Sequence, residues 1–394
     1  MARKILTLNQ ISLKGLERLP RDGYEIASEF AHPDAILLRS HQLKAEDIAD
    51  SVLAIGRAGA GVNNIPVTEC TRRGIPVFNS PGANANAVKE LVATAMLLGS
   101  RGIIEGIRYV DTLVDITDAA EMHRVLEAQK KQFKGNELVG KTLGVVGLGA
   151  IGSMVAEMAL TMGMEVVGYD PALSVEAAWR LSSKVRKADT LSALFARSDY
   201  ITLHLPVLDS TRGLINAELL GATQPGTCLL NFARQEIVNE ADLVTALDAG
   251  KLRKYIADFP SPALIGRDDV ILMPHIGAST DEAEDNCAIM AAEQLRDFLE
   301  NGNIRNSVNF PNLELERVRG CRLSVSNDNV PRILGSVLAI LADENINVID
   351  MLNKSRAEVA YNLIDIDTHV SDDVLQRMSE LEGVINVRLI GDCA

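Results

Sequence analysis

The sequence predicts an α/β protein with two doubly wound parallel sheets, followed by a smaller C-terminal module. Two observations predict the sheets: short apolar runs alternate with helix-forming segments through residues 1–80 and again through residues 141–275, which is the pattern of βα repeats. A third predicts the module, because residues 322–390 read as strand, helix, two strands, helix and strand, a ferredoxin-like order. The 394 residues suffice for two or three domains with their own cores.

The charge and composition of the chain exclude several classes of partner. A net charge of −14 repels the phosphates of nucleic acids and of anionic membranes, so we expect neither as a partner. No charged-then-apolar leader follows Met1, and no apolar run is long enough to cross a bilayer, so we expect a cytoplasmic protein. The five cysteines are scattered and show no metal-ligand spacing with the six histidines, which predicts reduced thiols and no metal site.

Apolar runs predict the strands of the first sheet at residues 4–9, 25–28, 35–40, 53–56 and 77–79. Ligands bind beyond the carboxyl ends of the strands in such sheets, where Arg39, Ser40, Arg57, Ala58 and Gly59 lie. We interpret Arg57 to Gly59 as a nest of backbone N–H groups for a carboxylate, with the arginine as a charge-assisted donor. A flexible turn with a solvated arginine is the alternative.

The segment between the two sheets is helix-forming. Apolar positions at helical spacing from Val88 to Leu98 predict one long helix over residues 84–110. Residues 111–132 continue as an amphipathic segment without a strand. This segment is either an arm that contacts a second copy of the chain or a solvated connection.

The second sheet begins with a glycine loop. An apolar run leads into Gly147-x-Gly149-x-x-Gly152 and then into a helix-forming segment. This order fits a dinucleotide pyrophosphate, because the glycines permit a tight turn and a close approach of phosphate to the backbone. Asp170 ends the next strand, where an acid accepts hydrogen bonds from a ribose, and Pro171 rather than arginine follows it. The sequence therefore predicts NAD as the cofactor in preference to NADP.

Later strands of the same sheet are predicted at residues 200–205, 227–232, 255–257 and 270–273. His275 is the candidate for proton transfer, because imidazole titrates near neutrality. Arg234 is the candidate for binding a carboxylate and stabilising charge on a substrate oxygen, and Asp258 lies between them in the sequence. The expected cofactor contacts are Gly147, Gly149, Ala150, Ile151, Gly152, Asp170, Leu205, Pro206, Ala233, Asp258 and Gly277.

Four motifs, in order, carry a resemblance to a known family. They are Gly56-Arg-Ala-Gly-Ala-Gly-Val-Asn-Asn64, Gly144-Val-Val-Gly-Leu-Gly-Ala-Ile-Gly152, Leu230-Asn-Phe-Ala-Arg234 and Pro274-His-Ile-Gly-Ala-Ser279. With this set the chain resembles the D-isomer-specific 2-hydroxyacid dehydrogenases, and the module after Asn309-Phe-Pro311 resembles an ACT domain. The resemblance implies a flavodoxin-like substrate domain at residues 1–87 and 286–313, a Rossmann NAD domain at 88–285 and a regulatory ACT domain at 318–394.

The resemblance also implies an activity. For members of the family with such a module, it is the oxidation of D-3-phosphoglycerate to 3-phosphohydroxypyruvate, the first step toward serine. His275 would act as the general base, Arg234 would bind and polarise the substrate, the nest would hold its carboxylate, and arginines outside the nest are candidates for the phosphate end. The expected substrate contacts are Arg39, Ser40, Arg57, Ala58, Gly59 and Arg72. We also expect a homodimer or homotetramer.

Two departures from the family pattern matter. The family has a glutamate after the Asp-x-Phe stretch, paired with the histidine, but this chain reads Ala257-Asp-Phe-Pro-Ser-Pro-Ala263 with no glutamate. We expect Asp258 to substitute in part, or the pH optimum to move. In the C-terminal module, Arg332 stands where serine-inhibited relatives have glycine. Asn329 and Asn347 are candidate contacts for an amino-acid effector such as serine.

The sequence leaves two other functions open. One is another 2-hydroxyacid dehydrogenase or 2-oxoacid reductase with an appended regulatory module. The other is a binding protein that uses NAD as a signal, as a corepressor relative of the family does. The retained Arg234 and His275 favour an enzyme, whereas the missing glutamate keeps the binding protein open.

Overall fold

The computed structural model describes residues 2–317 and 320–391. The chain divides into two compact units, Met1–Asn84 with Thr280–Ala394, and Ala85–Ser279. Residues 318–319 and 392–394, at the ends of the expected regulatory domain, lie outside the described part. None of the helices in the described residues is both long and apolar enough to span a membrane.

The first unit contains a five-stranded parallel sheet in the order β2-β1-β3-β4-β5, which confirms the flavodoxin-like arrangement. All four residues of β3 are fully buried, as parallel strands covered on both faces require. The strands are β1 (Arg3–Leu8), β2 (Tyr24–Ala27), β3 (Ala35–Leu38), β4 (Ala54–Arg57) and β5 (Val77–Phe78). The helices are α1 (Leu13–Leu16), α2 (Val67–Arg72) and α11 (Asp281–Asn301).

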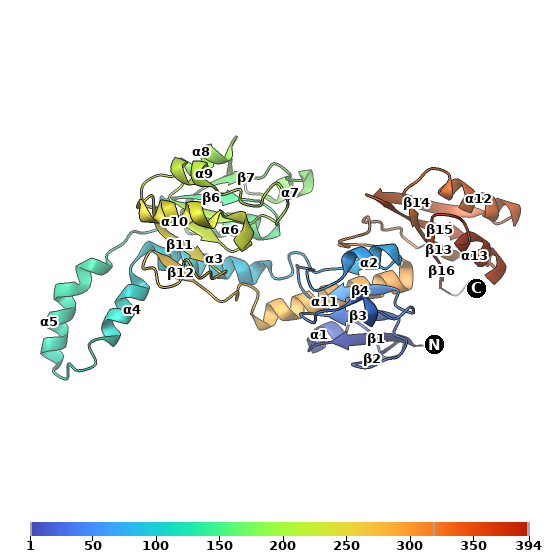
Figure 1. Ribbon diagram of the computed structural model, residues 1–394, viewed down its shortest axis with the longest axis horizontal. Coiled ribbons are helices and arrows are strands. Elements are labelled where there is room, and N and C mark those ends of the chain that lie inside the picture. Colours follow the sequence, from blue (N-terminus) through green and yellow to red (C-terminus); the bar gives the residue numbers. More distant parts are fainter. Residues whose placement is uncertain (1, 318–319, 392–394) are drawn as a thin grey trace. The chain divides into compact units, whose positions relative to one another are not determined.

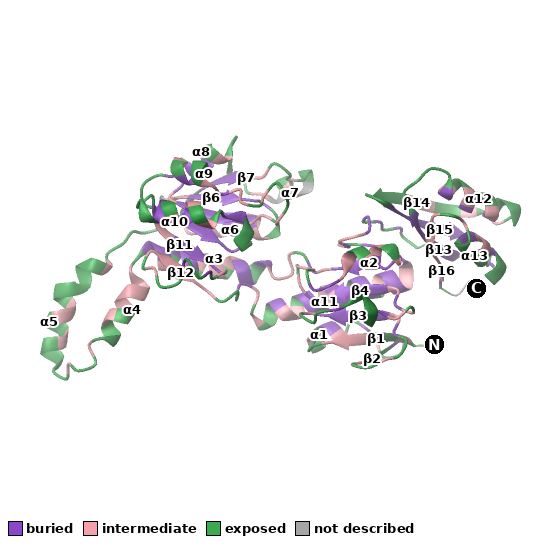
Figure 2. Ribbon diagram, in the orientation of Figure 1, coloured by how far each residue is buried: buried purple, intermediate pink, exposed green. Residues whose placement is uncertain are grey.

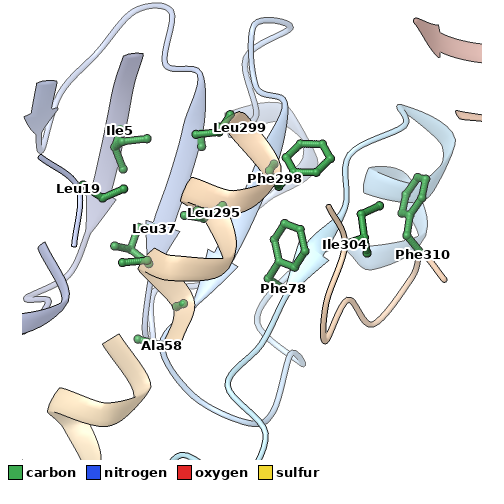
Figure 3. Close-up of a cluster of buried hydrophobic side chains, with 14 of the residues drawn as sticks. Ile5, Leu19, Leu37, Ala58, Phe78, Leu295, Phe298, Leu299, Ile304 and Phe310 are labelled. Carbon is green, nitrogen blue, oxygen red and sulfur yellow. The ribbon is translucent and has the colours of Figure 1, made fainter. Parts of the chain in front are cut away.

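Helix α11 packs its apolar stripe against this sheet. Ala288, Ala291, Leu295 and Phe298 recur at three- and four-residue spacing and are buried, which is the signature of a helix with one face in the core. Figure 3 shows Leu295 and Phe298 of the helix beside Leu37 and Phe78 of the strands. Gly56 of β4 is required for this approach, because a Cβ there would lie 2.8 Å from Leu295 Cδ1. Gly56 therefore has a packing role.

The second unit contains a seven-stranded parallel sheet in the order β12-β11-β10-β9-β6-β7-β8. The strand order reverses at β6, as in a Rossmann sheet with one added strand. The strands are β6 (Thr142–Val146), β7 (Glu165–Tyr169), β8 (Arg186–Lys187), β9 (Tyr200–Leu203), β10 (Thr227–Asn231), β11 (Leu252–Ala257) and β12 (Val270–Leu272). The helices are α3 (Ala85–Ser100), α4 (Ile103–Asp111), α5 (Ala119–Gln129), α6 (Ala150–Thr161), α7 (Val175–Arg180), α8 (Leu191–Phe195), α9 (Ala217–Ala222) and α10 (Glu240–Asp248).

The expectation of one helix over residues 84–110 is wrong. Helix α3 ends at Ser100 and α4 begins at Ile103, because the returning segment packs against the junction. The Gly102 N–H donates to the Phe133 carbonyl at 3.3 Å. Helices α4 and α5 then form an arm (Figure 1), and no described residue of either is buried. Figure 2 shows this contrast with the buried strands of the same unit.

The C-terminal module is part of the first unit and has the ferredoxin-like order that the sequence predicts. Its antiparallel sheet runs β14-β15-β13-β16. The elements are β13 (Cys321–Asp328), α12 (Ile333–Asp343), β14 (Val348–Arg356), β15 (Val359–Ile366), α13 (Asp372–Ser379) and β16 (Val384–Ile390). Cys321 is disulfide-bonded, which corrects the expectation of five reduced thiols, since spacing alone does not reveal pairing.

The module and its linker satisfy the last carbonyls of α11. A helix ends with carbonyl groups that have no partner within the helix, and their partial negative charge favours cations. Four side-chain donors reach consecutive carbonyls: Arg388 to Leu299 at 3.4 Å, Arg317 to Glu300 at 3.0 Å, Arg322 to Asn301 at 3.0 Å and Tyr361 to Gly302 at 2.7 Å. Arg322 is fully buried and also forms a two-hydrogen-bond ion pair with Asp365 at 2.6 and 2.7 Å. These bonds fix the module to the helix end.

Candidate active site

The glycine loop has the shape that a dinucleotide needs. Gly147 has φ +90°, and a Cβ there would lie 2.5 Å from the His204 carbonyl oxygen. A Cβ on Gly152 would lie 1.9 Å from the Gly147 carbonyl oxygen, whereas a Cβ on Gly149 would meet no atom within 4 Å. Two glycines are thus required by close backbone packing, and the third borders open space where a phosphate fits.

The groups around the loop also fit NAD. Helix α6 begins at Ala150 with no side-chain cap, so its first N–H groups are available to an anion; Ile151 lies in the same turn. Asp170 follows β7, and its carboxylate accepts hydrogen bonds from the N–H groups of Leu148 at 2.8 Å and Ala172 at 2.9 Å. The carboxylate thereby fixes the loop at the end of β6. When bound, NAD supplies the hydride acceptor.

A partly buried histidine, His204, lies beside the loop. His204 Nε2 pairs with Thr202 Oγ1 at 2.9 Å, and Nδ1 is buried without a partner in the described part of the chain. Burial lowers the pKa of His204 to about 3, so the imidazole is neutral at physiological pH. Leu205, next in sequence, would be 3.0 Å from a Cβ on Gly147. The expected cofactor contacts Leu205 and Pro206 therefore belong to the strand end adjacent to the loop.

Arg234, Asp258 and His275 follow three neighbouring strands. Asn231 of β10 is in register with Ala257 of β11, which is in register with Leu272 of β12. The three side chains therefore share the carboxyl edge of one sheet. Arg234 and His275 are exposed, and Asp258 is 2% exposed.

Asp258 fixes the loop that carries His275. Its Oδ1 accepts a hydrogen bond from the Ile276 N–H at 2.8 Å, and its Oδ2 accepts one from the Gly277 N–H at 2.6 Å. His275 has φ +57°, a costly conformation for this residue that the carboxylate helps to maintain. Within the described residues, no hydrogen bond joins Asp258 to His275. The imidazole instead contacts the ring of Phe259, with centroids 4.9 Å apart.

Asn231 fixes the neighbouring loop in the same manner. It is fully buried; its Nδ2 donates to the Arg234 carbonyl at 2.9 Å, and its Oδ1 accepts from the Ala233 N–H at 3.2 Å. Arg234 Nη1 donates back to the Ala233 carbonyl at 2.7 Å. This role of Asn231 was not predicted, although a polar residue at the end of an otherwise apolar run is a detectable signal.

In the first unit, Arg39 and Arg57 lie together. Arg57 Nε donates to the Arg39 carbonyl at 3.1 Å, and Arg39 Nη2 pairs with Glu284 of α11 at 2.6 Å. The N–H groups of Ala58 and Gly59 donate to the carbonyls of Leu38 and Arg57, so both are engaged within the loop. The next N–H groups, those of Ala60 and Gly61, have no hydrogen-bond partner in the described part of the chain and are the ones available to a carboxylate.

The structure places the other expected substrate contacts differently. The Ser40 N–H donates to Asn9 Oδ1 at 3.1 Å, which keeps Ser40 beside Arg39. Arg72 ends α2, the helix that returns from β4 to the start of β5, so it lies toward the amino edge of the sheet. It pairs with Glu69 at 2.8 Å. The structure therefore does not bring Arg72 together with Arg39 and Arg57.

The candidate effector contacts lie in the C-terminal module. Asn329 Nδ2 donates to the Ala357 carbonyl at 3.0 Å, and the Asn347 N–H donates to Asp367 Oδ1 at 3.3 Å. Arg332 has φ +83°, a conformation that favours glycine. Arg332, where the resemblance implies a glycine, thus has a glycine-like conformation with a larger side chain.

The fold and the residues at its carboxyl edge define a dinucleotide-dependent dehydrogenase. The chain belongs to the D-isomer-specific 2-hydroxyacid dehydrogenase family, and residues 107–277 match the family description "D-isomer specific 2-hydroxyacid dehydrogenase, NAD binding domain". The D-3-phosphoglycerate dehydrogenase of Escherichia coli is 31% identical over 98% of this chain and 97% of its own length.

Two further relatives bear related names. The D-3-phosphoglycerate dehydrogenase of Synechocystis is 39% identical over 71% of this chain, which spans about half (49%) of that protein's length. Among solved structures, the NAD+-bound 3-phosphoglycerate dehydrogenase of Entamoeba histolytica superposes with a TM-score of 0.61 at 28% identity, covering 78% of this chain and 99% of that one.

Proposed function

We propose that this protein oxidises D-3-phosphoglycerate to 3-phosphohydroxypyruvate with NAD, the first step toward serine, in the cytoplasm. The observation that carries the proposal is the Asp258 carboxylate, which holds the two N–H groups after His275 and so presents the imidazole at the same carboxyl edge as Arg234. The names of the relatives supply the substrate. The proposed domains are substrate-binding (1–87, 286–313), NAD-binding (88–285) and regulatory (318–394).

The roles of the residues follow from their chemistry. His275 takes the proton of the substrate hydroxyl, and bound NAD would supply the acceptor for the hydride. Arg234 binds the substrate and stabilises charge on the reacting oxygen. In the first unit, the loop from Arg57 to Gly61 (the Arg57 loop) holds the carboxylate, and Arg39 is the candidate for the phosphate. Asp258 acts as a positioning residue, because both of its oxygens bond to backbone N–H groups.

One assay tests this function. The purified protein is given NADH with 3-phosphohydroxypyruvate, pyruvate, glyoxylate or 2-oxoglutarate, and NADH oxidation is recorded. We expect the phosphorylated oxo acid to give the highest kcat/KM. Preference for another oxo acid would identify a different 2-oxoacid reductase. Binding of NADH without turnover of any of them would identify an NAD-sensing protein.

We further propose a homodimer or homotetramer in which the α4–α5 arm contacts a second copy. Ile107 and Val110 of α4 are more than half exposed. They line a cavity of about 470 Å3 between α4, α5 and the segment up to Phe133, whose wall is mostly apolar and includes the charged residues Asp111, Glu127 and Lys130. Covering such a patch with a second copy removes apolar surface from water. Light scattering on the Val110→Glu variant tests this: a smaller particle than wild type is expected, and an unchanged mass contradicts the role of the arm.

We also propose that Asn329 and Asn347 contact an amino-acid effector. Asn347 is exposed, and its side-chain amide has no hydrogen-bond partner in the described residues. Titration of L-serine against the initial rate tests this proposal. Rates that stay constant up to saturating serine contradict feedback through these residues.

A further inference from the structure

We infer that the first unit holds a second anion site, a polar cavity of about 430 Å3 beside the C-terminal module. The cavity suits a small carboxylate that also carries a hydroxyl or ammonium group. One wall is the tip of the β14–β15 hairpin, with Ser355 and Arg356, and the other includes Asn79, Asn306 and Asn312. It is separate from the Arg57 loop and from Asn347.

Arg356 supplies the positive charge. Its Nη1 donates to the carbonyls of Ser307 at 2.8 Å and Phe310 at 3.4 Å, which holds the guanidinium in place. Its Nε and Nη2 have no hydrogen-bond or ion-pair partner among the described residues, and no described residue of the cavity wall is acidic. Arg39 and Arg72, by contrast, are paired with glutamates. A fixed guanidinium with two free donors binds a carboxylate.

The asparagines select for a second polar group on the ligand. The Nδ2 groups of Asn306 and Asn79 donate to Gln294 Oε1 at 2.7 Å and to the Ala60 carbonyl at 2.6 Å. Both side chains keep an Oδ1 that accepts no hydrogen bond within the described chain, and an acceptor recognises a hydroxyl or an ammonium group. Asn312 Oδ1 accepts from the Asn306 N–H at 3.0 Å, which leaves its Nδ2 as a donor beside the arginine.

The cavity is connected to the Arg57 loop by hydrogen bonds. Gln294 of α11 is 3% exposed and bridges the cavity wall, since its Nε2 donates to the Asn79 carbonyl at 2.9 Å and its Oε1 accepts from Asn306. Asn79 then holds the carbonyl of Ala60, whose N–H is available to a carboxylate. A ligand on Asn79 and Asn306 therefore changes the affinity of the Arg57 loop for the substrate. This coupling, unlike the site itself, rests on the proposed function.

Calorimetry of the full chain with L-serine and D-glycerate tests the site, with acetate as a carboxylate that lacks the second polar group. We expect at least one of these two ligands to bind the wild-type protein more tightly than acetate does. For that ligand, we expect the Kd to rise about tenfold or more in the Arg356→Met and Asn312→Ala variants. Lys354→Met is the matched control, because Lys354 is exposed on the same strand and lies outside the cavity wall. Unfolding midpoints show that each variant folds.

Three results would overturn the site: no binding of either probe to wild type, binding unaffected by both cavity variants, or binding abolished by Asn347→Ala but retained by Arg356→Met. The coupling is measured separately as the KM for 3-phosphohydroxypyruvate with and without the bound probe. An unchanged KM with intact binding overturns the coupling alone. Absence of turnover with any oxo acid overturns the proposed function, and the calorimetry still decides the cavity.

Discussion

The carboxyl edges of the two parallel sheets hold their polar residues in different ways. In the second unit, Asp170, Asp258 and Asn231 all bond to backbone N–H groups of the loops beside them. In the first unit, Arg39 bonds to the side chain of Glu284, and both side chains are about 40% exposed. A buried acceptor on backbone donors fixes a loop, whereas an exposed ion pair rearranges at little cost. The sheet edge of the second unit is therefore preorganised, whereas the sheet edge of the first unit adapts to its ligand when Arg39 exchanges partners.

The largest expected effect is at the glycine loop. Gly152→Ala places a Cβ 1.9 Å from a backbone oxygen, and we expect a loss of about 1–3 kcal/mol in the free energy of unfolding together with the loss of NADH binding. Gly149→Ala is the control, because it meets no atom within 4 Å; it should keep wild-type stability and weaken NADH binding alone. Urea unfolding and NADH fluorescence measure both. Equal stability of the two variants contradicts the packing argument.

The Asp258→Asn variant tests whether the Asp258 carboxylate preorganises the loop that carries His275. The amide offers one acceptor oxygen to two buried N–H groups, so one donor loses its partner at a cost of about 1–3 kcal/mol. Displacement of His275 should lower kcat by about a hundredfold. Asp268→Asn, at an exposed side chain in the same region, should leave both quantities unchanged. Recording kcat across pH separates positioning from proton transfer: a profile that falls without shifting supports positioning, and a shifted midpoint supports a role in titration.

The pH dependence of the free energy of unfolding tests the burial of His204, which follows β9 at the carboxyl edge of the second unit's sheet. Its pKa is about 3 in the folded protein and about 6.5 when unfolded. Protonation therefore favours the unfolded state, so the stabilisation from a neutral His204 is complete above pH 6.5 and is lost as the pH falls toward 3. At pH 5 the loss is about 2 kcal/mol. Urea unfolding at pH 7.5 and pH 5.0 should show a smaller loss in His204→Asn than in wild type, and equal losses would contradict burial as the cause.

The smallest effect is expected at the edge of the first unit's sheet, where Arg39 pairs with Glu284. Glu284→Gln releases Arg39 from its ion pair, and we expect stability to change by less than about 1 kcal/mol. If Arg39 binds the phosphate, the KM for the phosphorylated substrate should fall several-fold while the KM for NADH stays constant. Glu293→Gln is the control on the same helix, where Glu293 pairs with Arg18 at 3.6 Å. An unchanged KM would remove Arg39 from the phosphate site.

Periodicity and glycine spacing were sufficient to predict the sheets, the module and the cofactor loop. The break between α3 and α4 was not predictable in this way, because it depends on Phe133, which is distant in sequence from Gly102. The engagement of the Ala58 N–H group likewise depends on the Leu38 carbonyl of a neighbouring strand. Asp258 was recognised as a site residue, but its partners follow from the path of the loop after β12. Local patterns reveal elements, and distant contacts decide what each polar group does.

The capping of α11 by the C-terminal module has a consequence for any shortened form of the chain that lacks this module. A chain that ends before residue 317 loses the donors from Arg317, Arg322, Tyr361 and Arg388 and leaves consecutive helix carbonyls without them. The ring of Phe298 also loses the Arg388 guanidinium that lies 4.6 Å above it. The module is therefore no detachable accessory: a gene fragment encoding only the two parallel sheets would lack part of its own scaffold.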